Sequence, residues 1–255
     1  MNIAKALLPD KIYYFLHKIY LRLKVRHLSA DDQYQSKNIG EVFSEVYKKE
    51  LWAQGEEGKY LNGGAKFYSG SGSYNKSSVD YIRFITEYIR ANNIHSLTDI
   101  GCGDFNIGKQ ICQQNPHISY YGVDVVSDLI NYNSENFGSD RIKFYCLNTL
   151  AEKIPQSDLL LIRQVLQHLS NGDIAQLTRN CFPGFGHILV TEHQPKPEYL
   201  VRANIEKSSG PNSRVGNANG SGVYLDKPPF GFKWTRVLTC EDDNPRTEIN
   251  TFKIG

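Results

Sequence analysis

A short apolar segment that ends in a glycine turn constrains this chain more than any other feature. Leu97–Ile100 has the length and character of a buried strand, and it runs directly into Gly101-Cys102-Gly103. Glycines at 101 and 103 lack the β-carbons that would keep a ligand from lying against the turn. Asp124 follows Gly103 by 21 positions, at the end of a second apolar segment. At this spacing an acid in a βαβ unit reaches a ribose diol, so the segment predicts a nucleoside-binding site.

From residue 78 onward, apolar segments alternate with amphipathic ones. Strands that alternate with helices favour an α/β fold with a doubly wound, mostly parallel sheet covered on both faces. The tail predicts two further strands in a terminal antiparallel hairpin at the sheet edge, for seven strands in all. The expected strands are Ser96–Ile100, Tyr120–Val123, Ile142–Cys146, Leu159–Ile162, His187–Thr191, Phe232–Cys240 and Thr247–Ile254, and the expected helices are Val79–Asn92, Gly108–Gln114, Ser127–Asn133 and Asp173–Asn180.

Residues 1–77 differ from this pattern and are expected to form an N-terminal helical extension that precedes the domain of residues 78–255. Apolar residues at helical spacing predict a helix over residues 11–28, namely Ile12, Phe15, Leu16, Ile19 and Leu23. Residues 29–40 are polar and predict a linker, and residues 41–51 predict a short helix. The glycine- and serine-rich stretch that follows, through Ser69–Ser73, is expected to be a lid or a plain linker.

The formal net charge of +2 conceals an asymmetry between the two parts. Residues 1–28 contain six Lys and Arg residues against Asp10 alone, a local charge of +5. The remainder therefore has 23 basic and 26 acidic residues, a charge of −3. A body of that sign is not expected to bind nucleic acid. For the basic helix we expect packing on the main domain, with contact to an anionic membrane surface as the alternative.

Several features indicate a cytoplasmic protein. No apolar run approaches the ~20 residues that span a bilayer, and Asp10 and Lys11 interrupt the run that could form a secretion signal. The five cysteines show no C-x-x-C pair, which favours reduced thiols over a disulfide framework or a zinc site. The seven histidines are scattered, so no metal site is expected.

The residues around the glycine turn distinguish between nucleoside cofactors. A nicotinamide-binding unit opens its helix with G-x-G-x-x-G, whereas Asp99 stands at the strand end here and Phe105 follows the second glycine. Asp99 would repel a pyrophosphate but can hold an ammonium group. S-adenosylmethionine carries an ammonium group and no phosphate, so the chemistry favours this cofactor.

From Tyr81 to Gly255 the chain resembles the class I S-adenosylmethionine-dependent methyltransferases, in the order of glycine turn, ribose acid, fourth strand and terminal hairpin. The resemblance implies a Rossmann-like methyltransferase fold. Four segments also look like a bacterial subgroup of these enzymes that is associated with sugar or surface-glycan modification: Trp52, Ser69–Ser73, Cys102–Asn106 and Val165–Ser170.

The resemblance also implies contacts to the cofactor. Asp99, Gly101 and Gly103 would contact its methionine end, Asp124 its ribose hydroxyls and Val125 its adenine. Asn148 stands where the class often has an acid for the adenine amine, and its amide oxygen can accept the same hydrogen bond. The expected contacts are completed by Thr149 and Gln164. Phe105 departs from the class pattern of a third glycine, as it does in the subgroup.

Three groups follow the fourth and fifth strands, where ligands of such sheets bind. The first is Arg163-Gln164, with His168 about one turn onward as a candidate base or a structural residue at a helix start. The second is Glu192-His193, in which His193 is a comparable base and Glu192 could orient either histidine, unless the two form an ordinary loop pair.

The third group is a long polar segment over residues 200–230. A long loop of this composition predicts an insertion that binds the acceptor. Arg202 and Tyr224 are expected to contact a glycan or small-molecule acceptor, and Arg214 to hold its phosphate or carboxylate.

We therefore expect a methyltransferase that moves a methyl group from S-adenosylmethionine to a hydroxyl of a sugar or a lipid-linked glycan precursor. One alternative is a small-molecule or protein methyltransferase of the same fold. Another is a non-catalytic scaffold that binds the cofactor. A nicotinamide oxidoreductase is disfavoured by Asp99 and Phe105.

Overall fold

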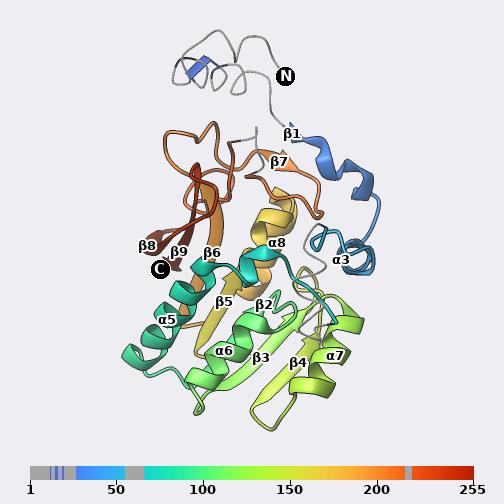
Figure 1. The fold of residues 1–255 in the computed structure, drawn as a ribbon, viewed down its shortest axis with the longest axis vertical. Helices are drawn as coiled ribbons and strands as arrows, with labels where there is room; N and C mark the ends of the chain where they lie inside the picture. Colours follow the sequence, from blue (N-terminus) through green and yellow to red (C-terminus); the bar gives the residue numbers. More distant parts are fainter. Residues whose placement is uncertain (1–11, 13–14, 17–18, 20–26, 55–65, 216–219) are drawn as a thin grey trace.

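A twisted sheet with helices on both faces forms the body of the protein (Figure 1). The computed structural model describes residues 12, 15–16, 19, 27–54, 66–215 and 220–255. The elements in chain order are β1 (His27–Leu28), η1 (Ser29–Tyr34), α3 (Ile39–Lys48), η3 (Ser71–Ser73), α5 (Lys76–Ala91), β2 (Ser96–Ile100), α6 (Asn106–Gln114), β3 (Ser119–Asp124), α7 (Ser127–Phe137), β4 (Ile142–Cys146), β5 (Leu159–Arg163), η4 (Leu166–His168), α8 (Asn171–Cys181), β6 (His187–Pro195), β7 (Glu206–Lys207), β8 (Trp234–Glu241) and β9 (Thr247–Ile254).

The main sheet has seven strands in the order β4-β3-β2-β5-β6-β9-β8. The first five are parallel, and β9 joins β6 antiparallel and pairs with β8 as a hairpin. The predicted doubly wound, seven-stranded fold with a terminal hairpin is confirmed. After β2 the chain runs outward through β3 and β4, then returns to the other side of β2 with β5. A ligand crevice is expected at this reversal, beyond the carboxyl ends of the strands.

Two hydrophobic cores hold the helices against the sheet. One core places residues of α5 and α6 against one face of the sheet, and the other places residues of α8 against the opposite face. Leu159–Ile162 is buried throughout because β5 lies inside the sheet and contributes side chains to both cores. Such a continuous apolar run is the pattern of a strand covered on both faces.

The polar residues 29–40, predicted as a linker, instead include the 3₁₀ helix η1 and the start of α3. Asn38 and Glu41 form a capping box that begins α3 at Ile39. Asp31 in η1 is fully buried, and its carboxylate lies 2.9 Å from the ammonium of Lys207, which is also buried. The local composition suggested a loop because the partner that neutralises Asp31 lies far along the chain.

The segment over residues 200–230 packs closely against the body in the part that the structure describes. Ile205, Val223 and Leu225 are buried, and β7 pairs in parallel with β1. Asn204 holds the turn that follows, since its side chain accepts the N–H of Tyr224 at 2.8 Å and donates to the Pro228 carbonyl at 2.9 Å. The segment is therefore a packed set of loops.

Most of the helix predicted over residues 11–28 lies outside the described residues. The four that the structure does describe before His27 are helical: Ile12, Phe15, Leu16 and Ile19. Across the described part of the chain, no helix is both long enough and apolar enough to cross a bilayer.

Candidate active site

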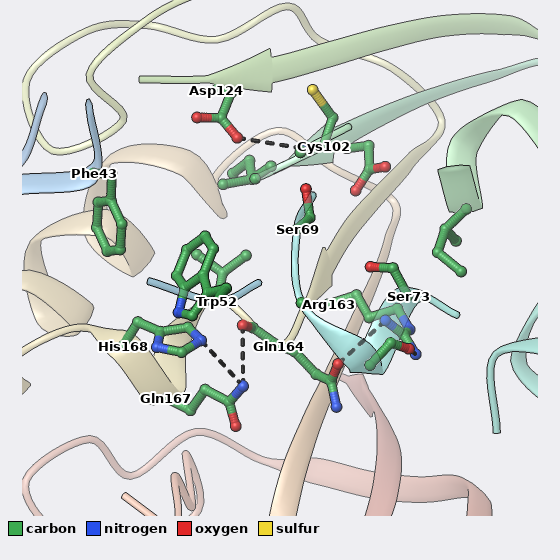
Figure 2. Close-up of a pocket in the computed structure, with 18 of the residues that line it drawn as sticks. Phe43, Trp52, Ser69, Ser73, Cys102, Asp124, Arg163, Gln164, Gln167 and His168 are labelled. Atoms are coloured by element: carbon green, nitrogen blue, oxygen red, sulfur yellow. Dashed lines mark hydrogen bonds between the residues drawn. The ribbon is translucent and has the colours of Figure 1, made fainter. Parts of the chain in front are cut away.

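A pocket of about 430 Å³ opens at the carboxyl ends of β2, β3 and β5, where the chain reverses across the sheet. The glycine turn, Asp124 and the His168 loop meet around it (Figure 2). Eleven of the residues predicted from the sequence line it: Asp99, Gly101, Gly103, Asp124, Val125, Asn148, Thr149, Arg163, Gln164, His168 and His193. Arg202, Arg214 and Tyr224 are not part of this lining.

The glycine turn has a backbone that other residues rarely adopt. Gly101 and Gly103 have φ angles of 70° and 55°. A β-carbon on Gly101 would lie 2.4 Å from a methyl group of Val165, and one on Gly103 would lie 2.3 Å from Oγ of Ser69. The turn therefore requires glycine at both positions, for its conformation and for the close approach of the neighbouring chain.

Asp124 lies at the end of β3 with its carboxylate held by backbone groups. Its oxygens accept the N–H groups of Gly103 and Val126, each at 3.2 Å. Desolvation raises the pKa of this carboxyl. An acid fixed beside the glycine turn and open to the pocket is suited to accept hydrogen bonds from a ribose diol.

Asp99 is buried at the end of the neighbouring strand β2. The Tyr120 hydroxyl donates to it at 2.7 Å, and burial raises the pKa of Asp99 to about 6. Its negative charge has a single direct hydrogen bond and lies in a desolvated position, so a cation in the pocket would stabilise it. The chemistry of this group fits the ammonium of S-adenosylmethionine.

The side of the pocket predicted to hold the adenine has few polar groups. Asn148 Oδ1 accepts the N–H of Leu150 at 3.0 Å, so one lone pair of the oxygen assigned to the adenine amine is already engaged. The amide oxygen has a second lone pair. Apolar side chains from separate elements complete this side, among them Ile39, Val125 and Leu147.

The serine- and glycine-rich segment before α5 forms a wall of the pocket, which its sequence left as a lid or linker. Ser69 and Asp104 bind reciprocally: the Ser69 N–H donates to the carboxylate at 3.0 Å, and Ser69 Oγ accepts the Asp104 N–H at 2.7 Å. Tyr47 adds a bond from α3 to Ser69 Oγ at 2.8 Å. Sequence reasoning missed these polar contacts because the partners lie 22 and 35 positions apart.

Arg163 also holds the segment that forms this wall. Its guanidinium donates to the Gly72 carbonyl at 2.7 Å and lies 5.0 Å from the ring centre of Tyr81. One nitrogen, Nε, is buried and has no hydrogen-bond partner among the described residues. Arg163 was expected to contact the acceptor. It does line the pocket, and the contacts described here show that its guanidinium also holds the pocket wall in place.

His168 lies among aromatic side chains and is poorly suited to bind a proton. Its ring centre is 5.2 Å from that of Trp52 and 6.5 Å from that of Phe43 (Figure 2). Burial, together with the positive charge of Lys207, lowers the pKa of His168 to about 3. A general base works best with a pKa near the working pH, so this environment favours a structural or ligand-contacting role.

His193 lines the pocket from β6, on the far side of β5 from Asp99, and has a carboxylate partner. Its Nε2 lies 2.9 Å from Asp242 Oδ2, and Thr247 Oγ1 donates to the same oxygen at 2.6 Å. Partial burial would raise the pKa of Asp242, but the hydrogen bonds from His193 and Thr247 hold it at about 2. An imidazole oriented by an ionised acid is an arrangement that accepts a proton during catalysis.

Glu192 does not supply that carboxylate, although the sequence suggested it. Its oxygens accept the N–H groups of Leu166 at 2.9 Å and Gln167 at 3.1 Å. Burial raises the pKa of Glu192 to about 8. The residue therefore holds the start of η4, and the acid beside His193 comes from the turn after β8.

Arg214 has a structural role that differs from the expected contact with an acceptor phosphate. Its side chain is fully buried and its guanidinium donates to the carbonyls of Ile205 and Leu169. Tyr224 lies against Lys227 and Trp234, away from the pocket lining. A charged residue in a Gly-, Asn- and Ser-rich stretch looks exposed in the sequence, but here it ties the loops together.

Comparisons with known proteins agree with this architecture. Residues 98–183 match a family model described as a methyltransferase domain. Daphnetin O-methyltransferase 1 of Secale cereale is 28% identical over 86 residues, which cover 34% of this chain and 23% of that protein. The match thus spans about a quarter of the length of that relative.

Solved structures extend the likeness to the whole fold. A candidate O-methyltransferase from Nostoc punctiforme PCC 73102 has a TM-score of 0.54 at 15% identity, covering 99% of this chain and 71% of that one. The N-methyltransferase NodS of Bradyrhizobium japonicum WM9, in complex with S-adenosyl-L-homocysteine, has a TM-score of 0.53 at 13% identity, covering 82% and 98%. The chain has the fold of the class I S-adenosylmethionine-dependent methyltransferases, with a match to a methyltransferase domain over residues 98–183.

Proposed function

We propose that the protein transfers a methyl group from S-adenosylmethionine to a hydroxyl group of a sugar or glycan precursor. The observation that carries the proposal is one pocket with two chemically different ends. One end is lined from β2 and β3 by Asp99, Asp124 and the glycine turn, and is suited to the cofactor. The other is lined by the His193–Asp242 pair from β6 and the turn after β8, with β5 between the two in the sheet.

The residues at the first end fit the cofactor group by group. Asp99 offers a desolvated carboxylate to an ammonium, and Asp124 offers an acceptor for ribose hydroxyls beside a turn without β-carbons. When bound, S-adenosylmethionine supplies a methyl group on a positively charged sulfur, ready for in-line displacement. The part of the chain is to orient the two reactants and to exclude water.

A hydroxyl acceptor must lose its proton as the new bond forms, because its pKa lies far above neutrality. His193 is the group that this pocket provides for the task. The proton moves from the acceptor oxygen to the imidazole, and Asp242 stabilises the imidazolium that results. With its pKa at about 3, His168 is a much weaker candidate for the same step.

The remaining lining suits a ligand with many hydroxyl groups. Amides and a guanidinium, which bind hydroxyls by hydrogen bonds, lie beside an indole on which a sugar face can stack. The residues that provide these groups are Arg163, Gln164, Gln167, Asn212 and Trp52. This composition supports a sugar or glycan acceptor over a purely apolar one.

The first experiment is calorimetric titration of the intact chain with S-adenosylmethionine and, separately, with NAD. We expect saturable binding of S-adenosylmethionine that Asp124→Asn weakens by roughly tenfold or more, the loss expected for charge-assisted hydrogen bonds. Asp128→Asn is the matched control, since Asp128 is an exposed acid on α7 that does not line the pocket. Binding of NAD alone, or of neither ligand, would overturn the proposal.

The acceptor is tested by transfer of a radiolabelled methyl group to a panel of sugars, nucleotide sugars and simple phenols. Methylation of a sugar hydroxyl that His193→Gln abolishes, with S-adenosylmethionine affinity unchanged, supports the full proposal. Cofactor binding with transfer only to amines or phenols would retain the methyltransferase and remove the glycan acceptor.

A further inference from the structure

Four large apolar side chains near the N-terminus are exposed. Ile12, Phe15, Leu16 and Ile19 have exposed fractions of 48%, 63%, 50% and 41%. Their i, i+3, i+4, i+7 spacing places them on one face of a helix. Packing of this helix on the main domain, the simpler expectation from the sequence, is not seen at these four side chains. Among the described residues, Val79 is the one other large hydrophobic side chain with such exposure.

The sequence places positive charge beside this apolar face. In the sequence, Lys11, Lys18 and Arg22 come one position before Ile12, Ile19 and Leu23, respectively. A helix that continued through these positions would carry a basic row beside the apolar one. Residues 1–28 carry a local charge of +5, whereas the remainder of the chain carries −3. Adjacent basic and apolar rows are typical of helices that lie in the plane of a membrane interface.

We propose that the segment centred on Ile12–Ile19 docks the protein on an anionic lipid surface. The apolar stripe enters the boundary between head groups and acyl chains, and the basic row contacts lipid phosphates. Pairing of this segment with the same segment of a second copy is a poorer arrangement, because two segments that each carry +5 would repel each other. The inference is independent of the reaction in the pocket, although a lipid-linked acceptor would be found at the same surface.

The test is cosedimentation of the intact chain with vesicles of phosphatidylcholine alone and with vesicles containing a quarter phosphatidylglycerol. Phe15→Glu and Val79→Glu form a matched pair, since both side chains are 63% exposed and both changes add the same charge. We expect binding to the anionic vesicles, weakened about tenfold or more by Phe15→Glu and unchanged by Val79→Glu. Salt at about 1 M should also weaken binding, by screening the basic row.

Other results would overturn the proposal. These are no binding of the unmodified chain, equal binding to both kinds of vesicle, or equal losses in the two variants. Sedimentation velocity without vesicles tests for a dimer. If the unmodified chain sediments as a dimer and Phe15→Glu as a monomer, the apolar stripe binds a second copy and not a membrane. Far-UV circular dichroism checks that each variant is folded, and titration with S-adenosylmethionine bears on the pocket alone.

Discussion

The imidazole of His193 lies 2.9 Å from the carboxylate of Asp242, a residue that follows it by 49 positions and comes from the turn between the last two strands. Thr247, at the start of β9, donates to the same carboxylate oxygen. Two elements at the sheet edge thus combine to orient one side chain of the pocket. Loss of the Asp242 carboxylate should affect the reaction more than the binding of the cofactor.

Asp242→Asn should slow methyl transfer by roughly 100-fold, because a neutral amide stabilises the imidazolium poorly. The affinity for S-adenosylmethionine, measured by calorimetry, should be unchanged. Asp243→Asn is the neighbouring control, since that acid is exposed. Equal rates for Asp242→Asn and the unmodified chain would show that the pair is structural only.

The same pair should contribute to stability in a pH-dependent way. The pKa of Asp242 is about 2, below its ordinary 3.8, so the folded protein binds this proton less readily than the unfolded chain. The contribution is therefore complete above about pH 4 and is lost as the pH falls towards about 2. His193→Gln should cost about 1 kcal/mol near neutral pH and nothing near pH 2, as measured by urea unfolding. A cost that is constant with pH would contradict this account.

Asp99 should make cofactor affinity fall and the stability of the ligand-free protein rise as the pH is lowered. Because its pKa is about 6 without ligand, protonation below that pH removes the charge that an ammonium needs. The affinity for S-adenosylmethionine should fall as the pH drops through about 6. Asp99→Asn should remove this dependence and weaken binding, while raising the thermal midpoint of the ligand-free protein near neutral pH, where the buried charge is unfavourable. Calorimetry and thermal scans at several pH values measure both effects.

Gly101→Ala should disrupt the glycine turn. The alanine would have φ near 70° and a β-carbon 2.4 Å from Val165, which together should cost about 2 kcal/mol or more and displace the turn from the cofactor. Gly186→Ala is the control, because a β-carbon there meets no atom within 4 Å. Unfolding free energy and cofactor affinity should both fall for the first variant. If Gly101→Ala bound S-adenosylmethionine as tightly as the unmodified chain, the glycine turn would not contact the cofactor.

Removing one partner of the buried ion pair between Asp31 and Lys207 should lower the free energy of unfolding. Asp31→Leu leaves an ammonium that is 2% exposed without its carboxylate, and we expect a loss of about 3 kcal/mol. Asp31→Leu combined with Lys207→Met removes both charges and should recover part of the loss. Urea unfolding of the two single variants and the double variant measures the coupling, and simple additivity would argue against a direct interaction.

The sequence predicted the sheet well because its strands are marked locally. Ser96–Ile100, Ile142–Cys146 and Thr247–Ile254 occur at the predicted bounds, since apolar runs between turn residues depend on no distant partner. The glycine turn and Asp124 also follow from local spacing. The glycine turn and Asp124 belong to one βαβ unit, so their spacing can be recognised without knowledge of the rest of the fold.

The parts that escaped prediction depend on partners far apart in the chain. Asp242 lies in a polar turn that resembles any other, and only the pairing of β9 with β6 brings it to His193. Arg214 was expected at the acceptor because nothing nearby shows that carbonyls 9 and 45 positions away receive its guanidinium. Asp31 was placed in a linker for the same reason. A charged side chain is predicted to be exposed unless a partner that would allow its burial can be recognised in the sequence.

The sheet order also sets a sequence of events during synthesis on the ribosome. The glycine turn, Asp99 and Asp124 all belong to β2, β3 and the turn after β2, whereas Asp242 and Thr247 belong to the hairpin formed by β8 and β9. Synthesis runs from the N-terminal end, so β2 and β3 leave the ribosome long before the final hairpin. His193 therefore acquires its acid only when nearly the whole chain has been made. The acid that orients this imidazole depends on the last hairpin of the sheet, and a chain that ended before β8 would lack it.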